Sequence, residues 1–106
     1  MKKIYYLKTC DTCKRIMKQM TDIDSYELQN IKDEPITASQ LDEMQALTGS
    51  YEKLFSRRAK LYAEMGLKNE KLSEADYKHY ILQHYTFLKR PVIINGDKIT
   101  IGKSPA

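Results

Sequence analysis

The only two cysteines of this chain, Cys10 and Cys13, stand in the segment Cys-Asp-Thr-Cys near the N-terminus. Two thiols at this spacing can form a redox couple or half of a metal site, or they can be two unrelated buried side chains. A zinc site needs about four ligands, but the chain has no third cysteine, and its two histidines, His79 and His84, lie far along the sequence. Haem attachment needs a histidine directly after the second cysteine, where Lys14 stands. We therefore expect no metal site.

The first cysteine lies at the start of a predicted helix. From Asp11 onward, apolar residues recur at intervals of three and four, namely at Cys13, Ile16, Met17 and Met20. The unpaired N–H groups and the dipole at a helix N-terminus lower the pKa of a thiol, and Lys14 and Arg15 add positive charge nearby. Cys13 lies one turn further on and can reach back to Cys10. We predict Cys10 as the attacking thiolate and Cys13 as the resolving thiol; two inert buried thiols are the alternative.

The elements around this pair predict an α/β domain. Short β-branched and aromatic runs predict strands at 4–7, 26–28, 92–94 and 99–101. Helical patterns cover 11–20, 37–49, 51–55, 58–66 and 73–84. Thr37 with Gln40 and Ser73 with Asp76 predict capped helix starts, and Asn95-Gly96 predicts a hairpin turn. We expect a single domain over residues 1–106, with a mixed central sheet and a block of short helices inserted at about residues 37–88.

Composition narrows the class of protein. With 42% hydrophobic and 30% charged residues the chain has the make-up of a globular domain, and no apolar run approaches the ~20 residues of a membrane helix. The N-terminus shows no signal-peptide pattern, so we expect a cytoplasmic protein with reduced thiols and no membrane partner. The net charge of +4 comes without a basic, aromatic-interleaved run, so we expect no direct nucleic-acid binding. Nothing in the pattern resembles a dimer seam, and we expect a monomer.

Four segments together resemble the arsenate reductase family, which also includes the Spx regulators. They are TCDTCKRIMKQM, IKDEPIT, LFSRRAKLYAEMGL and FLKRPVIINGDKITIG, and they occur in the order expected for that family. The resemblance implies a thioredoxin-like fold with a helical insertion. It also implies a C-terminal helix. Ser104-Pro105 has the pattern of a helix start, and we expect that helix to be absent from the sequence as printed, which stops at Ala106.

The resemblance also implies site residues. Cys10 matches the catalytic cysteine, Arg58 the mid-chain arginine, and Arg90 the arginine before a cis-proline, which Pro91 resembles. The two arginines are expected to hold negative charge, because a guanidinium has a planar fork suited to oxyanions. The expected substrate contacts are Thr12, Lys14 and Pro91.

The chain departs from the glutaredoxin-linked arsenate reductases at several positions. Tyr6 stands where they carry a histidine, and Cys13 and Lys14 stand where they carry serine and arginine. Near the C-terminus, Lys98 and Lys103 are the only candidates for their third arginine. The Cys-x-x-Cys form is more similar to Spx and its reductase-like relatives.

Three functions remain open from the sequence. The first is a thiol-dependent reductase acting on an oxyanion or a disulfide, with no bound cofactor and with glutathione or glutaredoxin as electron donor. The second is an Spx-like regulator that binds the C-terminal domain of the RNA polymerase α-subunit and uses the cysteine pair as a redox switch. The third is a family member without redox function, whose Cys10 would keep the ordinary thiol pKa of ~8.5.

Overall fold

A computed structural model describes residues 1–105 of the chain. By their internal contacts the residues form two compact units. The first unit consists of Met1–Pro35 together with the chain from Arg90 onward, and the second is Ile36–Lys89.

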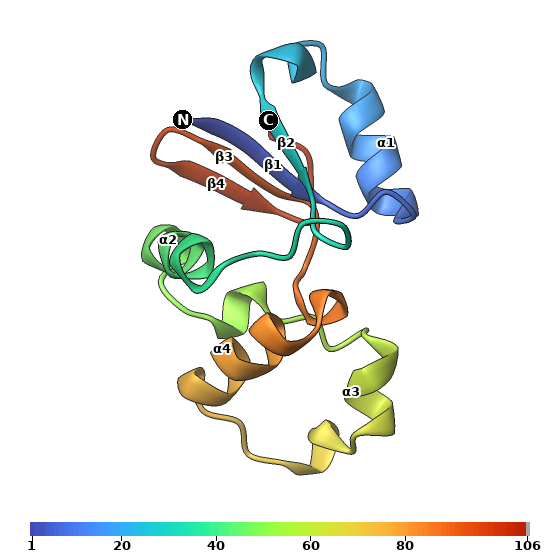
Figure 1. Cartoon of the computed structure of the whole chain (residues 1–106), viewed down its shortest axis with the longest axis vertical. Helices are drawn as coiled ribbons and strands as arrows, with labels where there is room; N and C mark the ends of the chain where they lie inside the picture. Colours follow the sequence, from blue (N-terminus) through green and yellow to red (C-terminus); the bar gives the residue numbers. More distant parts are fainter. Residues whose placement is uncertain (106) are drawn as a thin grey trace. The chain divides into compact units, whose positions relative to one another are not determined.

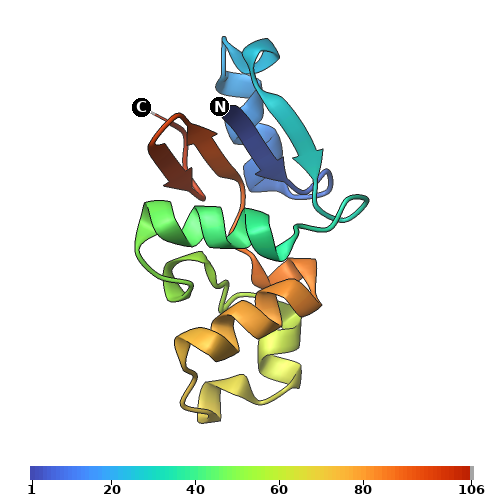
Figure 2. The same ribbon diagram turned by 60° about the vertical axis from the view of Figure 1, so that its left-hand side comes forward.

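The first unit contains a mixed four-stranded sheet. Its elements are β1 (Lys2–Tyr6), α1 (Asp11–Gln19), the short 3-10 helix η1 (Ile23–Ser25), β2 (Glu27–Asn30), β3 (Val92–Asn95) and β4 (Lys98–Ile101). The strand order is β2-β1-β3-β4. The β1 and β2 strands run parallel, as their arrows show in Figure 2, whereas β3 is antiparallel to both β1 and β4. The predicted mixed sheet is confirmed.

Helix α1 packs on one face of this sheet (Figure 1). Ile16 of α1 and Met20 at its end form one core cluster with Ile4, Tyr26 and Ile93, and every member is at most 9% exposed. The spacing of three and four along the helix produces this contact, because it places one apolar stripe toward the strands. The same packing fixes the N-terminus of α1, where Cys10 lies.

The second unit is helical. It contains α2 (Ala38–Thr48), α3 (Lys60–Glu64) and α4 (Glu74–Gln83), with the 3-10 helices η2 (Glu52–Leu54), η3 (Leu67–Asn69) and η4 (Tyr85–Phe87) between and after them. An aromatic cluster lies at its centre. The ring of Phe55 stacks on Phe87 with centroids 5.3 Å apart and contacts Tyr77 at 4.9 Å. An antiparallel β-bridge pairs Phe55 with Leu88, the residue after Phe87.

Both predicted helix caps are confirmed. Thr37 and Gln40 form a reciprocal capping box at α2, and Ser73 and Asp76 form another at α4. Each box satisfies N–H groups that a helix start leaves without an intrahelical partner. Gly49 ends α2 with a φ of 96°, a left-handed conformation that glycine adopts without a Cβ clash.

Most element boundaries differ from the sequence prediction by one or two residues, and three of the differences have a clear cause. Helix α3 begins at Lys60 and not at Arg58. The Ser56 N–H bonds to the Phe87 carbonyl (2.7 Å), Arg57 and Arg58 form a turn, and the backbone of Ala59 is not helical (φ −59°, ψ 134°). Helix α4 ends at Gln83, and His84, which the predicted helix included, is its C-cap residue with an extended backbone (φ −149°, ψ 131°).

The third difference concerns the hairpin. Asn95 pairs with Lys98 inside the ladder, so the two-residue loop is Gly96-Asp97 and not Asn95-Gly96. Gly96 takes the first loop position with a φ of 64°, which favours glycine there. None of the residues from Gly102 to Pro105 is helical. Within the described residues, no helix has the length and apolarity needed to cross a membrane.

Candidate functional site

Cys10 is the N-cap residue of α1. Its backbone is extended (φ −85°, ψ 119°), and α1 begins at Asp11. The Cys10 N–H donates to the Leu7 carbonyl at 3.0 Å, and the Lys14 N–H donates to the Cys10 carbonyl at 3.0 Å. These two bonds hold the turn between β1 and α1 and leave the Cys10 side chain at the open end of the helix.

The surroundings of Cys10 favour its thiolate. Partial burial alone would raise the pKa of this thiol, but the net pKa is lowered. The lowering comes from hydrogen bonds donated by the Cys13 backbone and thiol, from the positive charge of Arg90, and from the Thr12 N–H. Each contact stabilises the charged sulfur, which is the nucleophilic form of cysteine.

Cys13 has the opposite character. It is 1% exposed, and burial, together with the neighbouring Cys10, raises the pKa of its thiol to about 12. Both cysteines are free thiols in this structure. The pair therefore consists of one partly exposed sulfur that ionises easily and one buried sulfur that keeps its proton, one helical turn apart.

Arg90 and Pro91 lie at the start of β3, in the same unit as the cysteines. The Arg90–Pro91 peptide bond is cis. Pro91 is buried, and its carbonyl accepts a hydrogen bond from the Gly102 N–H at 2.9 Å. The partly buried Arg90 lies close enough for its charge to lower the pKa of both Cys10 and Cys13.

The structure thus brings Cys10, Thr12, Cys13 and Arg90 together. Arg58 belongs to the second unit, where it is an exposed residue just before α3, and its role stays a prediction. Its neighbour Arg57 has a structural contact: its Nη2 donates to Glu52 Oε2 at 2.8 Å and to the Tyr77 hydroxyl at 3.0 Å.

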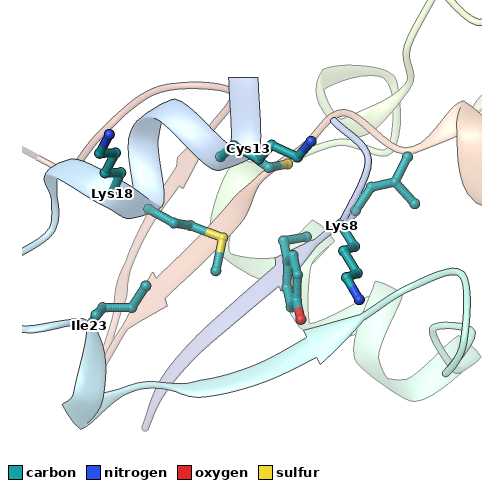
Figure 3. A pocket seen from close by; sticks show the side chains of 8 residues that line it. Lys8, Cys13, Lys18 and Ile23 are labelled. Carbon is teal, nitrogen blue, oxygen red and sulfur yellow. The ribbon is translucent and has the colours of Figure 1, made fainter. Parts of the chain in front are cut away.

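A hollow of about 450 Å³, which we call the Cys13 pocket, lies beside the pair (Figure 3). Cys13 and the predicted contact residue Lys14 line it, together with residues that the sequence analysis did not single out, among them Lys8, Lys18 and Ile23. The spacing of Lys14 and Lys18 could have indicated a shared helix face. Lys8 and Ile23 reach the pocket only through the fold, from the loop after β1 and from η1.

Between residues 1 and 105, no three His, Cys, Asp or Glu side chains are grouped so that they could hold a metal ion.

Comparison with known proteins identifies the family. The model of the ArsC family matches residues 5–106. The chain belongs to the ArsC family.

Its curated relatives include an arsenate reductase of Haemophilus influenzae, which is 42% identical over 45 residues, or 42% of this chain and 39% of the relative. They also include the global transcriptional regulator Spx of Streptococcus pneumoniae, which is 30% identical over 74 residues, or 69% of this chain and 56% of that protein. The matches therefore span less than two thirds of either relative's length.

Solved structures confirm the fold of this ArsC-family chain. An ArsC family related protein from Bacteroides fragilis superposes with a TM-score of 0.84 at 20% identity, over 98% of this chain and 91% of the other. The predicted α/β, thioredoxin-like fold is therefore confirmed, and so is the predicted family. The family contains both reductases and Spx regulators, and the chain is similar to one of each kind.

Proposed function

We propose that this ArsC-family protein is a thiol-dependent oxidoreductase in which Cys10 is the nucleophile and Cys13 the resolving thiol. The observation that carries the proposal is the asymmetry of the pair. Cys10 is partly exposed at the N-terminus of α1 beside Arg90, whereas Cys13 is buried one turn further along. A nucleophile must ionise and reach its substrate, and a resolving thiol must wait until the first covalent bond has formed.

With a disulfide substrate the reaction has two steps. The Cys10 thiolate attacks one substrate sulfur, the substrate S–S bond breaks, and one thiolate leaves. Cys13 then gives up its proton and attacks the Cys10 sulfur, which expels the second thiolate. The substrate gains two electrons, and a Cys10–Cys13 disulfide remains, which glutathione or glutaredoxin would reduce.

With an oxyanion such as arsenate, the same two thiols would supply the electrons. The Cys10 sulfur displaces a hydroxyl group as water and forms a sulfur–arsenic bond. Cys13, or glutathione from solution, then attacks that sulfur and releases the two-electron-reduced arsenite. In this proposal the guanidinium groups of Arg58 and Arg90 hold the anion, and Thr12, Lys14 and Pro91 contact it.

The test is a coupled assay of NADPH consumption with arsenate as acceptor, in the presence of glutathione, glutaredoxin and glutathione reductase. A disulfide acceptor is run in parallel. We expect turnover by the wild type, none by Cys10→Ser, and a slower second step in Cys13→Ser. If Cys10→Ser turns over every acceptor as fast as the wild type, the proposal is wrong.

A second candidate is an Spx-like regulator, favoured by the match of 69% of the chain to the Streptococcus pneumoniae protein. In this case the Cys10–Cys13 pair would change a protein-binding surface when it is oxidised. The test is capture of the C-terminal domain of the RNA polymerase α-subunit by the oxidised and the reduced protein. Absence of binding in both states would exclude this candidate.

A further inference from the structure

The Cys13 pocket has the dimensions and the lining of a small-molecule site. Its volume of about 450 Å³ lies within the range of roughly 300–1,000 Å³ that is usual for ligand pockets. Its wall is mainly apolar, from Tyr6, Leu7, Met17 and Ile23. An inorganic oxyanion has no apolar surface to bury against such a wall, whereas an organic group gains free energy there.

The charge around the pocket has one sign. Lys8, Lys14 and Lys18 line it, and none of the eight described residues that form its wall is acidic. Lys8 and Lys18 approach from different segments, the loop after β1 and the later part of α1 (Figure 3). Lysines on opposite sides of an apolar hollow make it complementary to an apolar ligand that carries a negative charge.

The pocket is directly connected to the cysteine pair. Cys13 is part of its wall, and the Cys13 thiol donates to the Cys10 sulfur. Two further wall residues, Leu7 and Lys14, are hydrogen-bonded to the Cys10 backbone, each at 3.0 Å. A group bound in the pocket therefore lies next to the turn that carries the nucleophile.

We propose that the Cys13 pocket binds the organic part of a small disulfide substrate, an apolar body that carries a carboxylate or sulfonate, while its sulfur reacts with Cys10. This inference rests on the proposed oxidoreductase function and names its substrate class. The Cys10 thiolate attacks the near sulfur, the S–S bond breaks, and the far half leaves as a thiolate. The near half stays on Cys10 as a mixed disulfide with its body in the pocket, until Cys13 loses its proton and displaces it as a second thiolate.

The test compares two aromatic disulfides of different charge, dithiobis(nitrobenzoate), which is anionic, and dithiodipyridine, which is neutral. The second-order rate constant of Cys10 with each is measured by the absorbance of the released thiol. In the double variant Lys14→Gln/Lys18→Gln we expect the rate constant with the anionic probe to fall by about fivefold to tenfold. With the neutral probe it should change by less than about twofold, because only general effects on the thiolate remain. Dividing each rate constant by the wild-type value removes the different intrinsic reactivities of the probes.

The matched control is Lys68→Gln/Lys71→Gln, which also removes two positive charges, but at exposed positions of the second unit. It should leave the ratio of the two rate constants unchanged. An equal loss for both probes in the pocket variant, or an equal change of the ratio in the control, overturns the inference. Cys10-dependent turnover in the coupled assay would still support the proposed function in that case, so the two failures are distinguishable.

A second measurement does not depend on the lysine variants. In Cys13→Ser, the mixed disulfide on Cys10 is trapped, once with the nitrobenzoate group and once with a methyl group from methyl methanethiosulfonate. We expect the nitrobenzoate adduct to shift the amide NMR signals of Lys18 and Ile23, relative to the methyl adduct. Shifts confined to the residues around Cys10 would place the aromatic body outside the pocket and overturn the inference.

Discussion

The thiol of Cys13 donates a hydrogen bond to the sulfur of Cys10, and each cysteine changes the ionisation of the other. The contact lowers the pKa of the acceptor, Cys10, because it stabilises a negative sulfur. It raises the pKa of the donor, Cys13, because the proton is held between the two groups. Burial is the largest cause of the raised pKa of Cys13, and it opposes the lowering of the pKa of Cys10.

The first prediction concerns the pH dependence of alkylation. The rate of reaction of Cys10 with iodoacetamide follows its thiolate fraction, so the midpoint of its pH profile should lie at a lower pH than that of an unperturbed cysteine, because the pKa of Cys10 is lowered. Cys13, whose pKa is raised to about 12, should react far more slowly than Cys10 over the same pH range. Mass spectrometry of the two peptides measures both rates. Replacement of the donor in Cys13→Ala should move the Cys10 midpoint upward, and Cys13→Ser, which keeps a hydroxyl donor, should move it less.

The second prediction concerns Arg90. Its positive charge lowers the pKa of Cys10, so Arg90→Gln should raise the midpoint of the alkylation profile and slow the reaction at neutral pH. Arg90→Lys keeps the charge and should retain most of the effect. The adjacent exposed Lys89 offers a control, because Lys89→Gln removes the same charge one residue earlier. An identical profile for Arg90→Gln and the wild type would contradict the role of Arg90.

The third prediction separates the two neighbouring arginines. Arg57 is bonded to Glu52 and Tyr77 and lies over the Tyr77 ring, 5.7 Å from its centroid. Arg57→Ala should therefore lower the free energy of unfolding by about 1 kcal/mol, measured by urea denaturation, and leave turnover unchanged.

Arg58→Ala should show the reverse pattern. As an exposed residue, Arg58 should contribute less than about 0.5 kcal/mol to stability. Its loss should reduce turnover of an anionic acceptor if it helps to hold that acceptor, as the proposed function requires. Unchanged turnover in Arg58→Ala would remove this residue from the proposed site.

The fourth prediction concerns the start of α2. The Thr37 hydroxyl accepts from the Gln40 N–H at 3.0 Å, and Gln40 Oε1 accepts from the Thr37 N–H at 3.1 Å. Thr37→Ala should cost about 1 kcal/mol of unfolding free energy, because a helix N–H loses its partner. Thr37→Ser keeps the hydroxyl and should cost much less. Equal losses in the two variants would show that the methyl group and not the cap is responsible.

Sequence alone could predict the features that depend on local chemistry. The capping boxes at Thr37 and Ser73 follow from residue types three apart, and the mixed sheet follows from short β-branched runs around a helix. The hairpin loop lies one residue later than the sequence predicts. Asn95 has a high turn propensity, but it pairs with Lys2 of β1 and Lys98 of β4 and therefore belongs to the sheet.

The part of the candidate site that depends on local sequence was also predictable. The cysteine pair is a local motif, and its order of ionisation follows from the position of Cys10 at a helix start. The pairing of Arg90 with Cys10 could come only from family resemblance, since a long stretch of sequence separates them. The Cys13 pocket was not predictable, because Ile23 and Lys8 come together only when η1 and the end of β1 take their places beside α1.

The first unit is interrupted in sequence by the whole of the second, and this has a consequence for the timing of synthesis. On the ribosome, β1 and the Cys10 turn emerge early, but β3, which pairs with β1, and Arg90 emerge only after Ile36–Lys89 has been made. The sheet can form only after β1 and β3 pair, and this long-range pairing is slow because closing the long intervening loop costs conformational entropy. A nascent chain therefore carries Cys10 without the cation that promotes its ionisation, and the thiol reaches its full reactivity only when the last strands of the fold are in place.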